Sequence, residues 1–187
     1  MNTHLSTKRI VLTGLLAALV VAGSAIRITV PVEITGTTSI HLGNILCALS
    51  GILLGPWLGG AAAGIGSALY DLTNPLYVSE AWITFLFKGA YGLAAGLVAW
   101  RVLGQCSYRR AVAATAAGAV VYAVLYLLKS YFYNGLLLGG LAPAAALVTV
   151  AGKLPATVFN AVVAVVAAPL LAVAIQKALV KQHLRLQ

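Results

Sequence analysis

The sequence predicts an all-α membrane protein, a single domain that crosses the bilayer with six transmembrane helices. Three observations favour this fold class: 61% of the 187 residues are apolar, only 8% are charged, and the apolar residues gather in long runs. Soluble domains average about 25% charged residues, and so few charges would not cover a surface in water. A helix that crosses a bilayer needs about 20 residues, which leaves room for six.

Breakers between the apolar runs place the helices near residues 9–26, 39–54, 57–71, 82–103, 109–133 and 155–180. The first run resembles a signal peptide in its basic start and small-residue end, but we interpret it as a retained helix because further apolar runs follow. The second and third runs are short and meet at Gly55-Pro56. Residues 136–150 are rich in Gly and Ala and contain Pro143, which predicts a partly ordered loop or a short re-entrant helix.

The charges predict the orientation. Six spans put both termini on one side of the membrane, and most basic residues fall on that side: Lys8, Arg9, Arg101, Arg109, Arg110, Lys177, Lys181 and Arg185. The three acidic residues, Glu33, Asp71 and Glu80, fall on the other side. Lys and Arg concentrate in cytoplasmic segments, so we expect both termini in the cytoplasm. Because the basic residues are spread over several helix ends, we exclude a nucleic-acid partner.

Motifs for catalysis, metal binding and nucleotide binding are absent from the sequence. His41 has no second ligand three or four residues away, and Ser67 does not fit Gly-x-Ser-x-Gly. No Gly-x-x-x-x-Gly-Lys-[Ser/Thr] loop occurs, so any ATP dependence must come from another chain. We therefore expect a protein that is no enzyme and that carries no metal or cofactor.

Polar residues inside the apolar runs are costly and mark candidate sites. Lys88 lies about two turns into its helix, where it either forms a salt bridge with Asp71, contacts a ligand or snorkels to the interface. Tyr122, Tyr126, Lys129 and Tyr133 recur at helical spacing. They form either an interfacial aromatic belt or the wall of a cavity for a flat heterocyclic ligand.

Other polar residues approach the same outer leaflet from different segments. The candidate ligand-binding residues are His41, Asn44, Asp71, Trp82, Lys88, Tyr122, Tyr126, Lys129, Tyr133 and Asn160. The candidate rim or lid residues are Arg27, Glu33, Asn74, Tyr77, Glu80, Asn134 and Lys153. Their convergence predicts one chamber that opens to the outside.

Two sets of small residues predict close helix packing. Gly60, Gly64, Ser67 and Asp71 share one face, which we interpret as a packing face that ends in a polar group. Gly14, Ala18 and Ala22 form a strip along the first helix. That strip either packs inside the bundle or binds a helix of another membrane subunit.

An ordered series of motifs points to a family. The series runs through Leu42-Gly43-Asn44, Leu53-Leu54-Gly55-Pro56-Trp57, Ala63-Gly64-Ile65-Gly66-Ser67-Ala68, Asp71-Leu72, Thr84-Phe85-Leu86-Phe87-Lys88-Gly89 and Gly92-Leu93-Ala94-Ala95-Gly96-Leu97. It resembles the substrate-binding S components of energy-coupling factor (ECF) transporters, most closely from about residue 14 to 104.

The resemblance implies a high-affinity binder for a B-group vitamin or precursor in the plasma membrane of a bacterium or archaeon, with an extracellular pocket. It implies a transmembrane coupling subunit and two ATP-binding subunits as partners, and delivery of the ligand by toppling in the membrane. In the family the first helix docks on the coupling subunit, and Gly14, Ala18 and Ala22 match that strip. The alternatives are a self-contained small-solute transporter or channel, and a structural subunit without a ligand.

Overall fold

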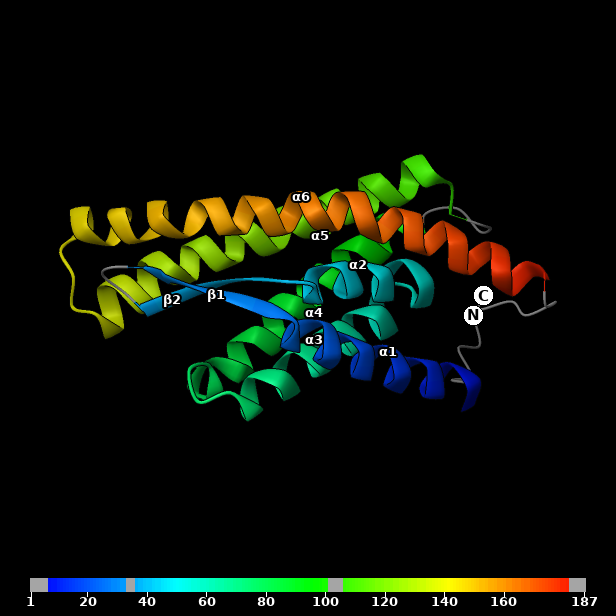
Figure 1. Ribbon diagram of the computed structural model, residues 1–187, viewed down its shortest axis with the longest axis horizontal. Coiled ribbons are helices and arrows are strands. Elements are labelled where there is room, and N and C mark those ends of the chain that lie inside the picture. The colour runs from blue at the N-terminus through cyan, green and yellow to red at the C-terminus, as the bar shows by residue number, and fades with distance from the viewer. Residues whose placement is uncertain (1–6, 33–35, 101–105, 182–187) are drawn as a thin grey trace.

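A computed structural model describes residues 7–32, 36–100 and 106–181 of the chain. Most of these residues are helical, and a two-stranded antiparallel hairpin follows the first helix (Figure 1). In chain order the elements are α1 (Thr7–Ala25), β1 (Arg27–Val32), β2 (Gly36–His41), α2 (Gly43–Leu54), α3 (Pro56–Thr73), the 3₁₀ turn η1 (Val78–Glu80), α4 (Ala81–Ala99), α5 (Tyr108–Lys129), the π-helix η2 (Ser130–Leu138) and α6 (Pro143–Lys181).

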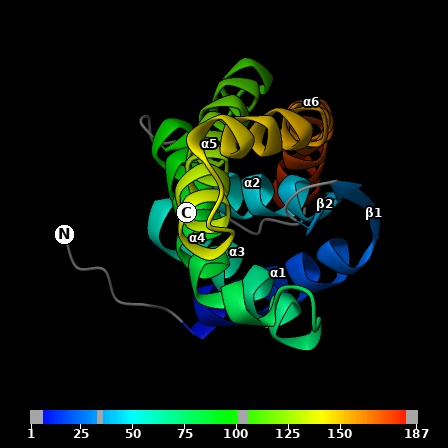
Figure 2. The same ribbon diagram turned by 90° about the vertical axis from the view of Figure 1, so that its left-hand side faces the viewer.

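The short helix α2 forms the centre of the bundle. It contacts α1, α3, α4, α5 and α6, and all of its residues except Leu46 are buried. A helix that is apolar on every side is expected to be buried in this way. Viewed end-on, the hairpin lies between α6 and α1, next to the N-terminal end of α2 (Figure 2).

Glycines allow α2, α3 and α4 to touch through their backbones. A Cβ atom at Gly92 of α4 would lie 2.7 Å from the carbonyl oxygen of Gly59, and one at Gly64 of α3 would lie 2.7 Å from that of Phe85. A Cβ at Gly60 would lie 3.0 Å from the oxygen of Gly89. The small-residue face predicted on α3 therefore packs against glycines of α4, as small residues do in membrane bundles.

Four stretches of the described chain are long and apolar enough to cross a membrane: Thr7–Ala25, Val78–Ala99, Tyr108–Leu138 and Pro143–Lys181. The helix α2 is apolar but has only 12 residues. The described part of the chain contains six α-helices, and α1, α4, α5 and α6 belong to the four stretches that meet the length and hydropathy of a span.

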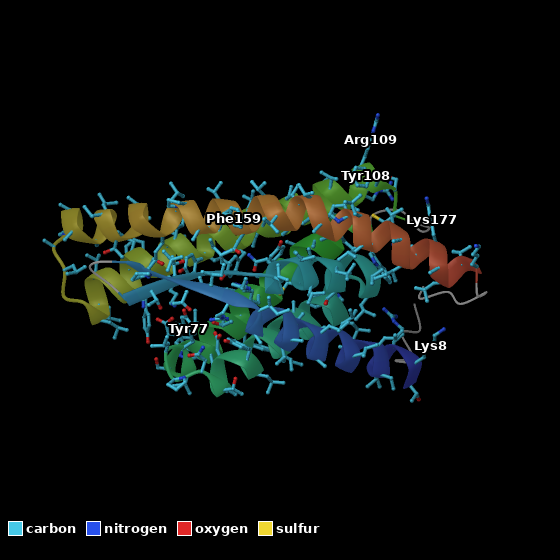
Figure 3. The ribbon with its side chains drawn as sticks, viewed as in Figure 1. Lys8, Tyr77, Tyr108, Arg109, Phe159 and Lys177 are labelled. Carbon is cyan, nitrogen blue, oxygen red and sulfur yellow. The ribbon has the colours of Figure 1, made fainter. Side chains whose placement is uncertain are left out.

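The basic side chains mark one end of the molecule. The helix α1 begins and α6 ends at that end, where Lys8, Arg109 and Lys177 point outward, whereas Tyr77 lies toward the opposite end (Figure 3). Arg101 and Arg185 lie outside the described residues.

Two parts of the predicted fold are wrong. Residues 136–150 form neither a partly ordered loop nor a separate short helix: η2 ends at Leu138, residues 139–142 connect it to α6, and α6 begins at Pro143, so one long helix replaces the predicted helix at 155–180. Pro143 lies at the start of α6, where proline is favoured. Pro155 lies inside α6, and a membrane helix tolerates it because neighbouring helices can satisfy the freed backbone groups. The predicted helix at 39–54 begins only at Gly43, because residues 36–41 pair with β1.

Candidate ligand-binding site

The hairpin forms one wall of the site. The sequence did not predict this hairpin. Its strands pair from Arg27 opposite His41 to Val32 opposite Gly36, and β-branched residues such as Ile28, Thr29 and Thr38 favour this extended structure. One side chain of α6 fastens the hairpin to the bundle. Asn160 accepts a hydrogen bond from the backbone N–H of His41 (3.0 Å) and donates one to the carbonyl of Ser39 (2.8 Å).

A cavity of about 270 Å³ lies between the hairpin and the helices. Its wall comes from every helix and both strands, including η1 and the π-helix η2. Ligand pockets are usually ~300–1,000 Å³, so this cavity suits a small molecule.

Most of the predicted residues border this one cavity. Of the ligand-binding candidates, the residues in its wall are His41, Asn44, Asp71, Lys88, Tyr122, Tyr126, Lys129 and Asn160. Of the rim candidates, those in the wall are Arg27, Tyr77, Glu80, Asn134 and Lys153. Glu33 lies outside the described residues. The polar groups that the sequence scatters over the chain thus meet in one chamber.

Three predicted residues lie away from the cavity wall. Trp82 is 60% exposed, because Ile83, Thr84, Phe87 and Lys88 occupy the inner face of α4. Asn74 is the C-cap residue that follows α3, where its side chain donates to the hydroxyl of Tyr70 (3.2 Å) and accepts from the N–H of Leu76 (3.0 Å).

The third is Tyr133, and the helix geometry explains its place. The chain passes from α-helix to π-helix after Lys129, and a π-helix brings residue i+5 rather than i+4 over residue i. Asn134 therefore takes the position below Lys129 that an α-helix would give to Tyr133. A cavity wall predicted from 3.6-residue spacing could not include this change.

Several hydroxyl residues of the wall were not predicted: Ser24, Thr37, Thr38, Ser39, Ser67, Ser79, Thr84 and Thr157. The signal that could have located these residues is the run of β-branched residues over 28–40, which is typical of strands. Thr157 lies four residues after Lys153 and three before Asn160, on one face of α6. The predicted helix began only at residue 155, so Lys153 was not expected to share a helix face with Thr157 and Asn160.

The inner part of the cavity is built around Lys88, which is 3% exposed. Its ammonium group donates to the side-chain oxygen of Asn44 and lies 3.8 Å from the ring centroid of Tyr122. The predicted salt bridge between Lys88 and Asp71 is not formed, and the ammonium group of Lys88 bonds to Asn44 instead. The ion pair found among the described residues joins Lys129 and Glu80.

That ion pair forms the outer part of the wall. Glu80 also accepts a hydrogen bond from the side-chain amide of Asn134 at 2.6 Å. The amide oxygen of Asn134 is buried, and no hydrogen-bond partner for it occurs among residues 7–32, 36–100 and 106–181. It is an acceptor that a bound molecule can use.

Three tyrosines form an aromatic ladder between these two parts. The rings of Tyr91 and Tyr122 stack with centroids 5.9 Å apart, and those of Tyr122 and Tyr126 with centroids 5.8 Å apart, each at 20°. The hydroxyl groups of Tyr126 and Thr38 lie 3.2 Å apart, which links the ladder to β2. The predicted stripe on α5 is thus a stacked wall as far as Tyr126.

His41, the last residue of β2, borders the cavity in its neutral form. Burial, followed by the positive charges of Lys88 and Arg27, holds the pKa of His41 well below its usual value. Its Nδ1 accepts a hydrogen bond from the backbone N–H of Gly43 (3.1 Å). The proton of the neutral ring therefore resides on Nε2, which leaves one donor.

Comparison with known proteins places the chain among membrane transport subunits. The family described as "ECF-type riboflavin transporter, S component" matches residues 4–177. A protein of Pyrococcus woesei, named only as an uncharacterized protein in the gap 3' region, is 32% identical over 118 residues, which cover 63% of this chain and 74% of that protein.

Two streptococcal relatives match over shorter stretches. A UPF0397 protein of Streptococcus gordonii is 36% identical over 97 residues, 52% of this chain and 50% of that protein. A UPF0397 protein of Streptococcus agalactiae is 34% identical over 108 residues, 57% of this chain and 56% of that protein. The matches thus span about half the length of these streptococcal proteins.

The match to the family covers nearly the whole chain, including α1 to η2, α6 as far as Lys177 and the whole described wall of the cavity. The chain therefore belongs to the family of ECF-type riboflavin transporter S components, transport subunits embedded in the membrane.

Proposed function

We propose that this chain captures a B-group vitamin or vitamin precursor from the extracellular side for an ECF-type importer. The observation that carries the proposal is the cavity itself. It joins stacked tyrosines, which suit a flat ring, to lysine, asparagine and hydroxyl groups, which suit polar ring edges. Such a chamber within an apolar bundle is costly to maintain without a ligand.

We further propose six membrane crossings with cytoplasmic termini. Lys8, Arg109 and Lys177 gather at one end of the bundle, and the positive-inside rule assigns that end to the cytoplasm (Figure 3). The cavity residue Tyr77 lies toward the other end, which supports capture from outside. The glycine contacts among α2, α3 and α4 allow the two shorter helices to pack as crossing segments.

The small-residue strip of α1 supports docking on a coupling subunit. Gly14, Ala18 and Ala22 are exposed, whereas α1 packs into its own bundle through Leu16, Ala17, Val20, Gly23 and Ser24. A Cβ atom at Gly14 would have no neighbour within 4 Å. The strip is therefore free for a helix of a partner, and two ATP-binding subunits would drive delivery of the ligand by toppling.

Replacing Gly14 by leucine tests the docking surface. We expect the variant to fold and bind ligand normally, but to lose about ten-fold or more in co-purification with a co-expressed coupling subunit, because backbones can no longer approach. Ala174→Leu, at an exposed position of α6, is the matched control and should co-purify normally. Equal co-purification of both variants would contradict this docking surface.

Capture is tested by purifying the full chain in detergent, releasing bound small molecules and identifying them by mass spectrometry. We expect a water-soluble vitamin or precursor, with direct binding measured by titration calorimetry. Recovery of an empty protein that binds no vitamin would overturn the proposal. Uptake by the chain alone in liposomes would favour a self-contained transporter, and uptake only with the coupling and ATP-binding subunits would favour the importer.

Tyr126→Ala should weaken binding of the recovered ligand about five-fold or more, because stacking against an aromatic ring contributes roughly 1 kcal/mol beyond the buried area. Tyr131→Ala is the matched control, since Tyr131 is half-buried and lies outside the cavity wall. Titration of both variants with the same ligand measures whether the affinity falls only in Tyr126→Ala. Unchanged affinity in a folded Tyr126→Ala protein would indicate that the ladder is only structural.

A further inference from the structure

The charges that face the cavity are unbalanced. Arg27, Lys88, Lys129 and Lys153 border it, against two carboxylates, Asp71 and Glu80. The whole chain contains only three acidic residues, so even with Glu33 added the four cations would outnumber the acids. The cavity therefore holds excess positive charge inside an apolar bundle.

Three of these cations have clear partners. Lys129 pairs with Glu80, and Lys88 is held by Asn44 and the ring of Tyr122. Arg27 donates to the carbonyl of Ser24 (2.9 Å), and its guanidinium lies 4.1 Å and 4.9 Å from the ring centroids of Tyr70 and Tyr77.

Lys153 differs from the other three. It is only 4% exposed, and its ammonium group lies 5.9 Å from the ring centroid of Tyr126, near the limit of a cation–π contact. Among residues 7–32, 36–100 and 106–181, no carboxylate lies within ion-pair distance of it, and no side-chain hydrogen bond from its ammonium group is formed. Its charged neighbour Glu80 is already engaged by Lys129 and Asn134.

A buried cation without an anion is strongly unfavourable, and removal of one partner from a buried pair is costly for the same reason. An anion delivered by a ligand would complete this site. The ring of Tyr126 lies beside Lys153, and the free amide oxygen of Asn134 belongs to the same wall. The three groups together suit a ring compound with an acidic group at one edge and a hydrogen-bond donor.

Given the proposed capture function, we infer that the ligand is an anion, a small ring compound whose carboxylate or phosphate group binds Lys153. Neutral relatives of the same shape bind more weakly, and cationic ones are repelled by the excess positive charge. The ligand is thus selected by its acidic group as well as by its ring.

The test compares acid and neutral partners of one shape on the full chain in detergent. The probe pairs are nicotinate with nicotinamide and biotin with biotin amide for a carboxylate, and flavin mononucleotide with riboflavin for a phosphate. We expect the acid of at least one pair to bind ten-fold or more tightly than its neutral partner, and the molecule that co-purifies to be an acid. The pair that shows the preference indicates whether the acidic group of the ligand is a carboxylate or a phosphate.

The variant Lys153→Gln should reduce that preference to about two-fold or less, since charge-assisted hydrogen bonds exceed neutral ones by about ten-fold in affinity. Lys177→Gln removes the same charge from an exposed position of the same helix and should leave the preference unchanged. Lys153→Arg, which keeps the charge, should retain most of it and shows that the site still folds.

The outcomes separate the two proposals. Equal or tighter binding of the neutral partner, or a neutral or cationic molecule recovered with the protein, overturns the anion inference and leaves ligand capture standing. Acid preference that survives in a folded Lys153→Gln protein overturns the role of Lys153. A protein that binds no probe and carries no molecule overturns capture, and the anion inference with it.

Discussion

Replacing Glu80 by glutamine should destabilise the protein by about 3 kcal/mol, because the change leaves Lys129 as a buried charge without its ion partner. The side chains of Lys129 and Glu80 are only 10% and 18% exposed, so solvent screens this pair weakly. Glu80 also accepts the hydrogen bond from Asn134, and glutamine presents one oxygen where the carboxylate presents two. The free energy of unfolding in mixed detergent micelles measures the effect.

The control for this prediction removes both charges. In the double variant Glu80→Gln/Lys129→Met no buried charge is left unpaired, and most of the lost stability should return. The double-mutant cycle then gives the coupling energy of the pair. A single variant within about 0.5 kcal/mol of the natural protein would show that the pair is effectively exposed.

Replacing Gly92 by alanine should destabilise the bundle by about 1–3 kcal/mol, the usual effect of overpacking. The new methyl group would lie 2.7 Å from the carbonyl oxygen of Gly59 and 3.0 Å from the Cα of Gly60. Both atoms belong to backbone, which cannot rotate away, so α3 and α4 must separate. Thermal unfolding followed by circular dichroism reports the loss.

Gly89→Ala is the matched control one turn earlier on the same helix. Its Cβ would meet the oxygen of Gly60 at 3.6 Å, an ordinary contact. Alanine favours helix over glycine by up to ~1 kcal/mol, so this variant should be as stable as the natural protein or more stable. Equal losses at both positions would contradict the close contact at Gly92.

Hydropathy predicted the helices well because a bilayer requires long apolar segments with internally satisfied backbones. Hydropathy did not predict the π-helix or the strand pairing, because backbone hydrogen bonding decides these features. Because the π-helix η2 follows Lys129, Asn134 rather than Tyr133 borders the cavity. Pairing of the two short strands moves the start of α2 to Gly43. Pro155 predicts a helix start, but it lies inside α6, because contacts with neighbouring helices let a membrane helix tolerate proline.

The same division holds for the site. Lys88, Lys129 and Asn160 could be chosen from sequence because polar groups at membrane depth are costly and must be buried together. Their partners could not be predicted from the sequence, because Lys88 binds Asn44 rather than Asp71, and Lys129 binds Glu80, which lies 49 residues earlier in the chain.

Composition determined that the polar groups of this membrane chain are scarce, and the positions of the charged residues along the sequence predicted that most basic residues gather at one end. Only the tertiary structure decided which of these groups meet, because the hairpin, the central α2 and the glycine contacts set the distances between helices. An ion pair forms over a few ångströms, whereas periodicity in sequence specifies only the face of a helix.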